Sequence, residues 1–231
     1  MMRKEETTLL SACDGLPLSL IWGYPQTDIK GVVQLVHGMA EHKERYLGFM
    51  EYLTQHGYIC VLHDHRGHGK SVRDKEDLGY LYDHEATYIV EDVHQINMLL
   101  HKSYPDLPVY LFGHSMGSLV VRAYCKQYDT TIDGLIVCGS PSENKAASFG
   151  KALASLMEKS KTDHYRSPLL QKLAFGKHNQ NFPDEASENA WLCSDVEVVK
   201  AYDEDPFCGY VFTLNGFANL FALMQKVYRC V

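Results

Sequence analysis

The sequence predicts an α/β fold in which a mostly parallel β-sheet is flanked by helices. Short apolar runs of five or six residues, typical of strands buried on both faces, alternate with longer stretches whose apolar residues recur at helical spacing. Several of the apolar runs end in turns that contain glycine. This alternation of strand and helix is the pattern of a parallel sheet covered on both faces.

The strands are expected in the first 141 residues. Residues 7–11 and 16–22 resemble two strands joined by a turn at Cys13-Asp14-Gly15, which predicts an antiparallel hairpin at the sheet edge. Four buried parallel strands are expected at residues 31–36, 58–62, 109–112 and 134–138. Helices are expected between them, one ending at Gly57 and another with apolar residues at positions 89, 93, 96 and 100.

The second part of the chain is predicted to be helical. Helices are expected over residues 146–159, 168–175, 189–193 and 195–202, followed by a long final helix with a wide apolar face. Ser194 and Glu197 form a capping-box pattern. We expect residues 1–141 to form the N-terminal part of the core, and residues 142–231 to form a helical cap that walls off a substrate pocket.

Composition restricts the class of protein. The 231 residues have a formal charge of −7, which gives no electrostatic basis for binding nucleic acid or an anionic membrane. The seven cysteines are odd in number, and no two have C-x-x-C spacing, which favours reduced, buried thiols. No signal peptide and no membrane-spanning run are expected, and the expected localisation is cytoplasmic.

The strongest motif is Gly113-x-Ser115-x-Gly117, at the junction of a predicted strand and a predicted helix. It fits a nucleophile elbow, in which glycines two residues to either side of the serine avoid collisions with neighbouring elements. The amide of Met116 would then point to where a carbonyl oxyanion forms. The alternative is an ordinary glycine-rich turn with a serine at a helix N-terminus.

A second motif, His37-Gly38-Met39, follows the predicted strand at 31–36. Open α/β sheets bind ligands at the carboxyl ends of their strands. The Met39 amide is therefore the candidate for a second oxyanion donor, and a simple tight turn is the alternative. We expect His37 and His42 to be structural and to hydrogen-bond within this loop.

A histidine-rich turn follows the strand at 58–62. Its His-x-His-x-x-His pattern could gather zinc ligands, and it consists of His63, His65 and His68. A dinuclear metallohydrolase would require an aspartate where this chain has Gly67. We therefore expect no metal here, and a structural turn in which Asp64 pairs with Arg66.

Together the motifs resemble those of the monoacylglycerol lipase and lysophospholipase branch of the α/β-hydrolases, the serine aminopeptidase-like family. The matching segments are residues 37–42, 64–71, 113–118, 191–195 and 201–206. The resemblance implies an α/β-hydrolase fold and a lipid-like ester substrate, with no cofactor. It implies Ser115 as the nucleophile, Met39 and Met116 as oxyanion amides, and an elbow formed by Gly113, His114 and Gly117.

One departure from the family pattern concerns the rest of the triad. In the family the acid and the histidine follow the serine and lie after further core strands. After Ser115 this chain has only His164 and His178, both in the predicted cap. We therefore expect a truncated chain, with the catalytic Asp, the catalytic His and the C-terminal core units beyond Val231.

Two other functions stay open. The chain could be an inactive fragment or pseudoenzyme that binds an acyl ligand without turnover. A peptidase, acyltransferase or haloperoxidase on the same scaffold is the third reading, because fold does not determine chemistry. Transient membrane contact of the cap is a further hypothesis, and the sequence does not predict acyl chain length, head group or oligomeric state.

Overall fold

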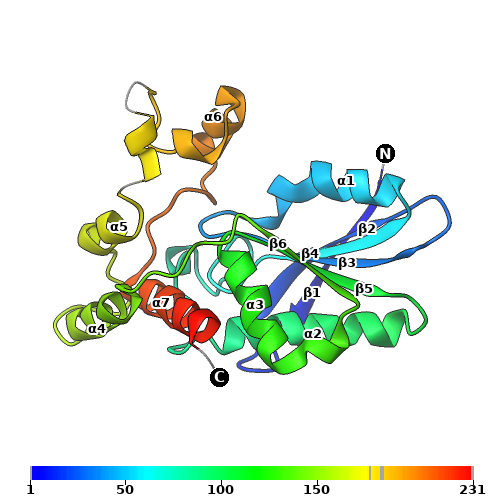
Figure 1. Ribbon diagram of the computed structural model, residues 1–231, viewed down its shortest axis with the longest axis horizontal. Coiled ribbons are helices and arrows are strands. Elements are labelled where there is room, and N and C mark those ends of the chain that lie inside the picture. Colours follow the sequence, from blue (N-terminus) through cyan, green and yellow to red (C-terminus); the bar gives the residue numbers. More distant parts are fainter. Residues whose placement is uncertain (1, 177, 183–184, 230–231) are drawn as a thin grey trace.

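The sheet has six strands in the order β1-β2-β4-β3-β5-β6, with helices on both faces (Figure 1). The computed structural model describes residues 2–176, 178–182 and 185–229. The strands are β1 Arg3–Leu10, β2 Pro17–Tyr24, β3 Gly31–Val36, β4 Tyr58–His63, β5 Val109–His114 and β6 Gly134–Cys138. β1 pairs antiparallel with β2, and β2 with β4, whereas β3, β4, β5 and β6 are parallel.

The α-helices are α1 Leu47–Gln55, α2 Tyr88–Ser103, α3 Met116–Tyr128, α4 Ala147–Glu158, α5 Pro168–Phe175, α6 Val196–Glu204 and α7 Leu214–Tyr228. Short 3-10 helices span Lys43–Tyr46, Lys75–Asp77, Asp129–Thr131, His178–Asn181 and Ala190–Leu192. The expected hairpin, the parallel strands and the helices between them are confirmed. The described helices include none that is both long and apolar enough to cross a bilayer.

The two faces of the sheet bury different clusters of side chains. On one face, Val33 and Leu35 of β3 pack with Met50 of α1 and with Leu62 of β4. On the other face, Val36 packs with residues of α2, α3 and α7. Alternate residues of a strand point to opposite faces, so β3 is buried from both sides along its whole length.

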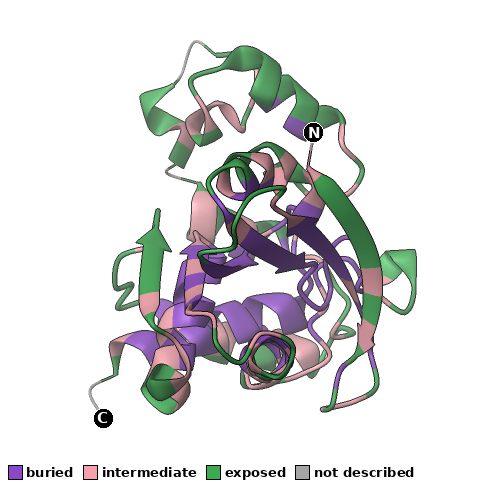
Figure 2. Cartoon of the chain, turned by 90° about the vertical axis from the view of Figure 1, so that its right-hand side faces the viewer, coloured by how far each residue is buried: buried purple, intermediate pink, exposed green. Residues whose placement is uncertain are grey.

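The strand β6 forms as expected, but the prediction that it is buried is wrong (Figure 2). Leu135, Ile136 and Val137 are 39%, 51% and 41% exposed, and Cys138 is exposed too, although we expected its thiol to be buried. The reason is position. β6 is the end strand of the described sheet and pairs only with β5, and an apolar run does not report how many neighbours it will have.

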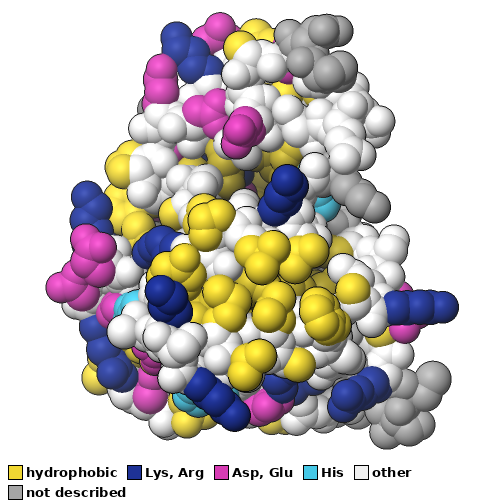
Figure 3. All heavy atoms as spheres, turned by 90° about the vertical axis from the view of Figure 1, so that its left-hand side faces the viewer, with side chains coloured by type: hydrophobic (Ala, Val, Ile, Leu, Met, Phe, Trp, Pro, Cys, Tyr) yellow, Lys and Arg dark blue, Asp and Glu magenta, His cyan; other side chains and the backbone are white. Residues whose placement is uncertain are grey.

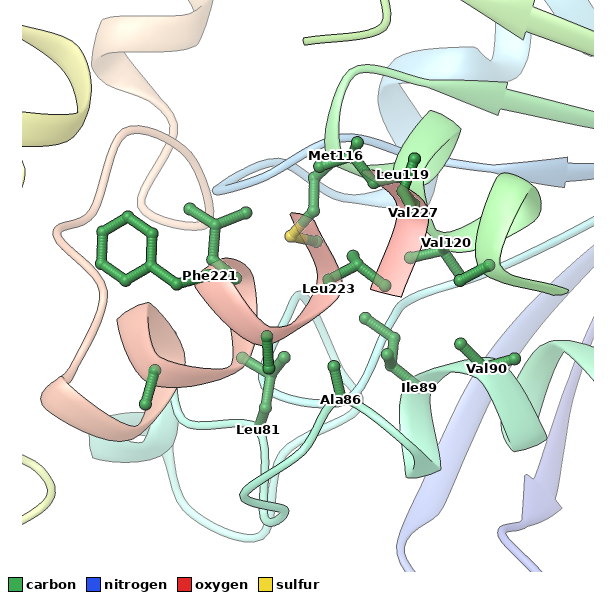
Figure 4. Packing of buried hydrophobic residues seen from close by; sticks show 14 of the residues in the cluster. Leu81, Ala86, Ile89, Val90, Met116, Leu119, Val120, Phe221, Leu223 and Val227 are labelled. Carbon is green, nitrogen blue, oxygen red and sulfur yellow. The ribbon is translucent and has the colours of Figure 1, made fainter. Parts of the chain in front are cut away.

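The final helix α7 joins the core beneath the sheet. Its apolar residues pack against α3 and α4, as its wide apolar face predicts. Figure 4 shows Leu223 and Val227 of α7 facing Met116 and Leu119 at the start of α3. Helix α7 therefore supports the helix that follows Ser115.

Helices α5 and α6 lie away from the sheet (Figure 1). The chain returns to the core at the end of α6. The hydroxyl of Tyr202, in the last turn of α6, and the N–H of Gly209 both donate to the carbonyl of Ala40, at 2.9 and 3.0 Å. The N-cap of α6 is Asp195, not Ser194 of the expected capping box, because the Asp195 carboxylate accepts from the Glu197 N–H. The cap boundary at residue 142 stays a prediction.

The expected pair of Asp64 with Arg66 does not form. Arg66 is fully buried, and its Nε donates to Asp92 at 2.8 Å, while its other nitrogens bond Asp14 and Ser11. Asp64 instead accepts from the Lys43 ammonium at 2.8 Å. Buried charges require close partners, and the fold provides these from distant segments.

Candidate active site

Ser115 lies at the sharp turn between β5 and α3 and is half-buried. Its backbone has φ 52° and ψ −119°, a conformation that residues other than glycine rarely adopt and that is often found at functional sites. The Ser115 N–H donates to the carbonyl of Cys138 at the end of β6, at 3.0 Å. The Ser118 N–H and hydroxyl donate to the Ser115 carbonyl, which fixes the turn from the helix side.

The two elbow glycines are required by packing. A Cβ on Gly113 would lie 2.5 Å from the Gly117 carbonyl oxygen. A Cβ on Gly117 would lie 2.3 Å from the carbonyl oxygen of Val36 and 2.4 Å from that of His37. These atoms belong to the backbone and cannot rotate away, so the steric argument for glycine at both positions is confirmed.

The loop after β3 lies directly against the serine. A Cβ on Gly38 would be 3.2 Å from the Cβ of Ser115. Met39 follows Gly38, and Met116 is the first residue of α3, where helix amides have no intrahelical partner. The structure thus brings the two predicted motifs together, and the role of the two amides as oxyanion donors stays a prediction.

Glu41 holds this loop in its conformation, and the sequence did not reveal that role. Its Oε1 accepts from the Gly38 N–H at 2.5 Å and from the Tyr46 hydroxyl at 2.8 Å, and its Oε2 accepts from Arg45 at 2.5 Å. Burial and the neighbouring Glu41 raise the pKa of Tyr46, so its hydroxyl remains a donor. Glu41 thereby fixes the peptide next to Met39.

His37 is structural, as expected. Its Nδ1 donates to the Gly38 carbonyl at 2.7 Å, and its Nε2 accepts from the His65 N–H at 2.9 Å. Burial and the nearby His68 hold the pKa of His37 well below its ordinary value. Both ring nitrogens are therefore occupied, and the ring is neutral.

His42 hydrogen-bonds within its own loop, as expected, and also with a residue outside that loop. Its Nδ1 lies 2.6 Å from Glu44, and its Nε2 lies 2.8 Å from Asp205, which comes from the segment after α6. Burial lowers the pKa of His42, but hydrogen bonds with Cys208, Glu44 and Asp205 outweigh it and raise the pKa to about 10. His42 thus links the loop beside Ser115 to the helical part of the chain.

The histidines of the turn after β4 lie close together and are fully buried, and the absence of a metal from this turn stays a prediction. Burial lowers the pKa of His63 to about 3 and that of His68 to about 4, so both are neutral. The rings of His63 and His68 each pack against the ring of His65, and Gly67 provides the backbone reversal at φ 73°. The turn is a structural one.

Within the described segments, no histidine hydrogen-bonds to the Ser115 hydroxyl. His164 bonds Asp163 and Asp77, and His178 bonds the Phe175 carbonyl. The expectation that neither serves as the base stays a prediction. The described site therefore consists of the serine, its strained turn and the loop that carries Gly38.

Sequence comparison finds relatives among lipases. The chain is 31% identical over 182 residues to a monoacylglycerol lipase from Mycolicibacterium smegmatis, covering 79% of this chain and 58% of that protein. It is 30% identical over 145 residues to the monoglyceride lipase of Mus musculus, covering 62% and 46%. The chain thus spans about half the length of the curated relatives it matches.

Structural comparison finds similar folds in an esterase and in a lipase. A thermostable carboxyl esterase from Bacillus coagulans superposes with a TM-score of 0.86 at 26% identity, over 99% of this chain and 73% of that one. A monoglyceride lipase from Saccharomyces cerevisiae gives a TM-score of 0.71 at 19% identity, over 99% and 69%, a likeness of fold alone. The family described as serine aminopeptidase, S33, matches residues 27–230. The chain therefore has the α/β-hydrolase fold and belongs to the serine aminopeptidase S33 family.

Proposed function

We propose that this protein is a serine hydrolase that cleaves carboxylic esters, with Ser115 as the nucleophile. The observation that carries the proposal is the strained backbone of Ser115, at φ 52°, in a turn closed by two glycines and facing Gly38. Such strain persists only where surrounding packing enforces it, and it exposes a side chain at the edge of the sheet. The names of the lipase relatives support an ester as the substrate.

In the proposed reaction, the Ser115 oxygen attacks the ester carbonyl carbon, and the alcohol leaves from the tetrahedral intermediate. The amides of Met39 and Met116 hold the oxyanion, and water then hydrolyses the acyl-enzyme. In this mechanism a histidine takes the serine proton and then returns it to the departing alcohol. Because no histidine among the described residues hydrogen-bonds to the Ser115 hydroxyl, acyl binding without turnover is the second candidate function.

The proposed substrates are monoacylglycerols or lysophospholipid-like esters. Two relatives support this class, the Mycolicibacterium monoacylglycerol lipase and a Bacillus subtilis phospholipase that is 30% identical over 135 residues. A broad apolar patch on the face of α4 and α5 supports transient contact with lipid (Figure 3). Its strongly exposed members are Phe149, Leu156, Leu169 and Leu173.

A fluorophosphonate probe tests the nucleophile. We expect the protein to gain the mass of one phosphonyl group on Ser115, and Ser115→Ala to gain none. Ser140→Ala is the matched control, since this serine follows the neighbouring strand β6 and should leave labelling unchanged. Labelling that survives in Ser115→Ala would exclude Ser115 as the nucleophile, and an unlabelled protein that still binds a fatty acid would favour the second candidate.

A substrate panel tests the proposed ester class. We expect p-nitrophenyl esters and monoacylglycerols to be hydrolysed, and aminoacyl amides to be left intact. Faster release from the amides would identify a peptidase on the same scaffold. Each rate is compared with that of Ser115→Ala, which corrects for spontaneous hydrolysis.

A further inference from the structure

His42, Asp205 and Cys208 come together from two segments far apart in the sequence. His42 lies in the loop after β3, and the other two lie between α6 and α7. One ligand atom from each residue lies within 4.8 Å of the other two, and the His42 and Cys208 side chains are buried. Imidazole, carboxylate and thiolate are the groups that bind zinc in proteins.

Contacts around the cluster orient two of these ligands. His42 Nδ1 lies 2.6 Å from the Glu44 carboxylate, so its Nε2 faces Asp205. A histidine that binds a metal through one nitrogen commonly donates from the other to a carboxylate. The Asp205 Oδ1 accepts from the Phe207 N–H at 2.8 Å, which leaves its Oδ2 directed toward His42.

Backbone contacts hold the two segments together independently of the cluster. The carbonyl of Ala40 accepts from both the Tyr202 hydroxyl and the Gly209 N–H, on either side of Asp205 and Cys208. The Cys208 N–H also donates to the Asp205 carbonyl at 3.0 Å. The fold therefore keeps the three residues close together without relying on contacts within the cluster.

We propose that His42 Nε2, an Asp205 carboxylate oxygen and the Cys208 thiolate bind a zinc ion, with water as the fourth ligand. Ligand atoms of a tetrahedral zinc ion lie about 3.3–3.8 Å apart. The hydrogen-bonded pair of His42 Nε2 and Asp205 Oδ2, at 2.8 Å, is closer than this, so these two atoms must separate by about 0.5–1 Å to admit the ion. Binding displaces the proton between His42 and Asp205 and the thiol proton of Cys208.

The proposed ion would fasten the segment after α6 to the loop beside Ser115. That loop carries Gly38, which packs against the serine, and Glu41, which holds it in its conformation. A metal at His42 would thus stabilise the geometry of the candidate active site without contacting the substrate. The competing explanation is a hydrogen-bonded latch of His42 and Asp205 that binds no ion.

Cobalt(II) is the direct probe, because a tetrahedral cobalt–thiolate site absorbs visible light and shows a sulfur-to-metal charge-transfer band. The 231-residue protein, freed of metal with a chelator and kept reduced, is titrated with cobalt chloride and then with zinc. We expect one equivalent to produce both absorptions and zinc to abolish them. No saturable absorption in the wild-type protein would overturn the proposal.

Two variants test the thiolate ligand and the orientation of His42. Cys208→Ala should lose the charge-transfer band, and Glu44→Gln should weaken cobalt binding about 10-fold or more through the orientation of His42. Cys193→Ser, a cysteine outside the cluster, should keep the wild-type spectrum. An unchanged charge-transfer band in Cys208→Ala would refute the site, and circular dichroism of each variant verifies that it is folded.

Discussion

The strands β3 and β6 both pair with β5, the strand that leads to Ser115, yet they lie in opposite environments. Their sequences are similar, Gly-Val-Val-Gln-Leu-Val and Gly-Leu-Ile-Val-Cys. Every residue of β3 is buried, whereas four of the five residues of β6 are exposed. The difference arises because β3 lies between β4 and β5, while β6 has one neighbouring strand in the described sheet.

This comparison shows that a strand of given composition stabilises the protein only through what covers it. Burying an aliphatic side chain contributes about 1.5–3 kcal/mol relative to leaving it exposed. The two sides of the nucleophile turn therefore differ in rigidity. Toward β3 the turn is fixed by packed backbone, and toward β6 it is held by the hydrogen bond from Ser115 to Cys138.

The largest predicted effect is acid destabilisation, which should originate at the β3–β4 side. The pKa of His63 is lowered to about 3 and that of His68 to about 4, both by burial. In the unfolded chain these two histidines bind protons below about pH 6.5. In the folded protein they bind protons only when the pH falls to their lowered pKa values. Above pH 6.5 the two histidines do not reduce the free energy of unfolding. At pH 5 they should together reduce it by about 4 kcal/mol.

Urea unfolding at pH 7.5 and pH 5.0 measures this loss. His63→Leu replaces one titrating side chain with an apolar one of similar size. We expect the difference in the free energy of unfolding between the two pH values to be about 2 kcal/mol smaller in this variant. Equal pH dependence in His63→Leu and the wild-type protein would contradict the prediction.

The next largest effect is expected from truncating one side chain in each strand, with a greater loss of stability in β3 than in β6. Leu35→Ala in β3 should reduce the free energy of unfolding by about 2–5 kcal/mol, because Leu35 is fully buried. Ile136→Ala in β6 should reduce it by less than about 1 kcal/mol, because half of this side chain is exposed. Denaturant midpoints at equal m-value give both numbers, and similar losses would remove the contrast between the strands.

The glycines on the two sides of the turn offer a finer test. Gly117→Ala drives a methyl group into the backbone at the end of β3 and should destabilise the protein by about 3 kcal/mol. Gly139→Ala, after β6, meets only the His114 ring at 3.3 Å, so its cost is that of a positive φ, about 1 kcal/mol. A Gly139→Ala effect as large as that of Gly117→Ala would show that both sides are equally tight.

The smallest effect on stability is expected for a charge on the exposed strand. Ile136→Lys should change the free energy of unfolding by no more than about 0.5 kcal/mol. It should also reduce self-association at high concentration, because lysine on an edge strand opposes pairing with another chain. Sedimentation velocity measures this, with Ile29→Lys, an exposed isoleucine outside the sheet, as the control. Unchanged association in Ile136→Lys would argue against pairing through β6.

Much of the fold was predictable because it follows from local periodicity. The spacing of Ile89, Val93, Ile96 and Leu100 identifies α2, and all four side chains are buried. The glycines around Ser115 identify the turn because their reason is steric and local. The exposure of β6 was not predictable, since it depends on the number of neighbouring strands.

Contacts between residues far apart in the chain could not be predicted from the sequence either. Asp64 and Arg66 are two residues apart and of opposite charge, yet each pairs elsewhere, with Lys43 and Asp92. Similarly, His42 finds Asp205 across 163 residues. Such contacts form because the fold buries the charges together, and no spacing in the sequence records them.

The buried guanidinium of Arg66 has a consequence for the order in which the chain folds during synthesis. It bonds Ser11 and Asp14 at the hairpin turn and Asp92 in α2. In addition, β2 pairs with β4, which is separated from it in the chain by β3 and α1. An isolated two-stranded hairpin is only marginally stable. The first residues to leave the ribosome should therefore not fold stably until Asp92 has emerged.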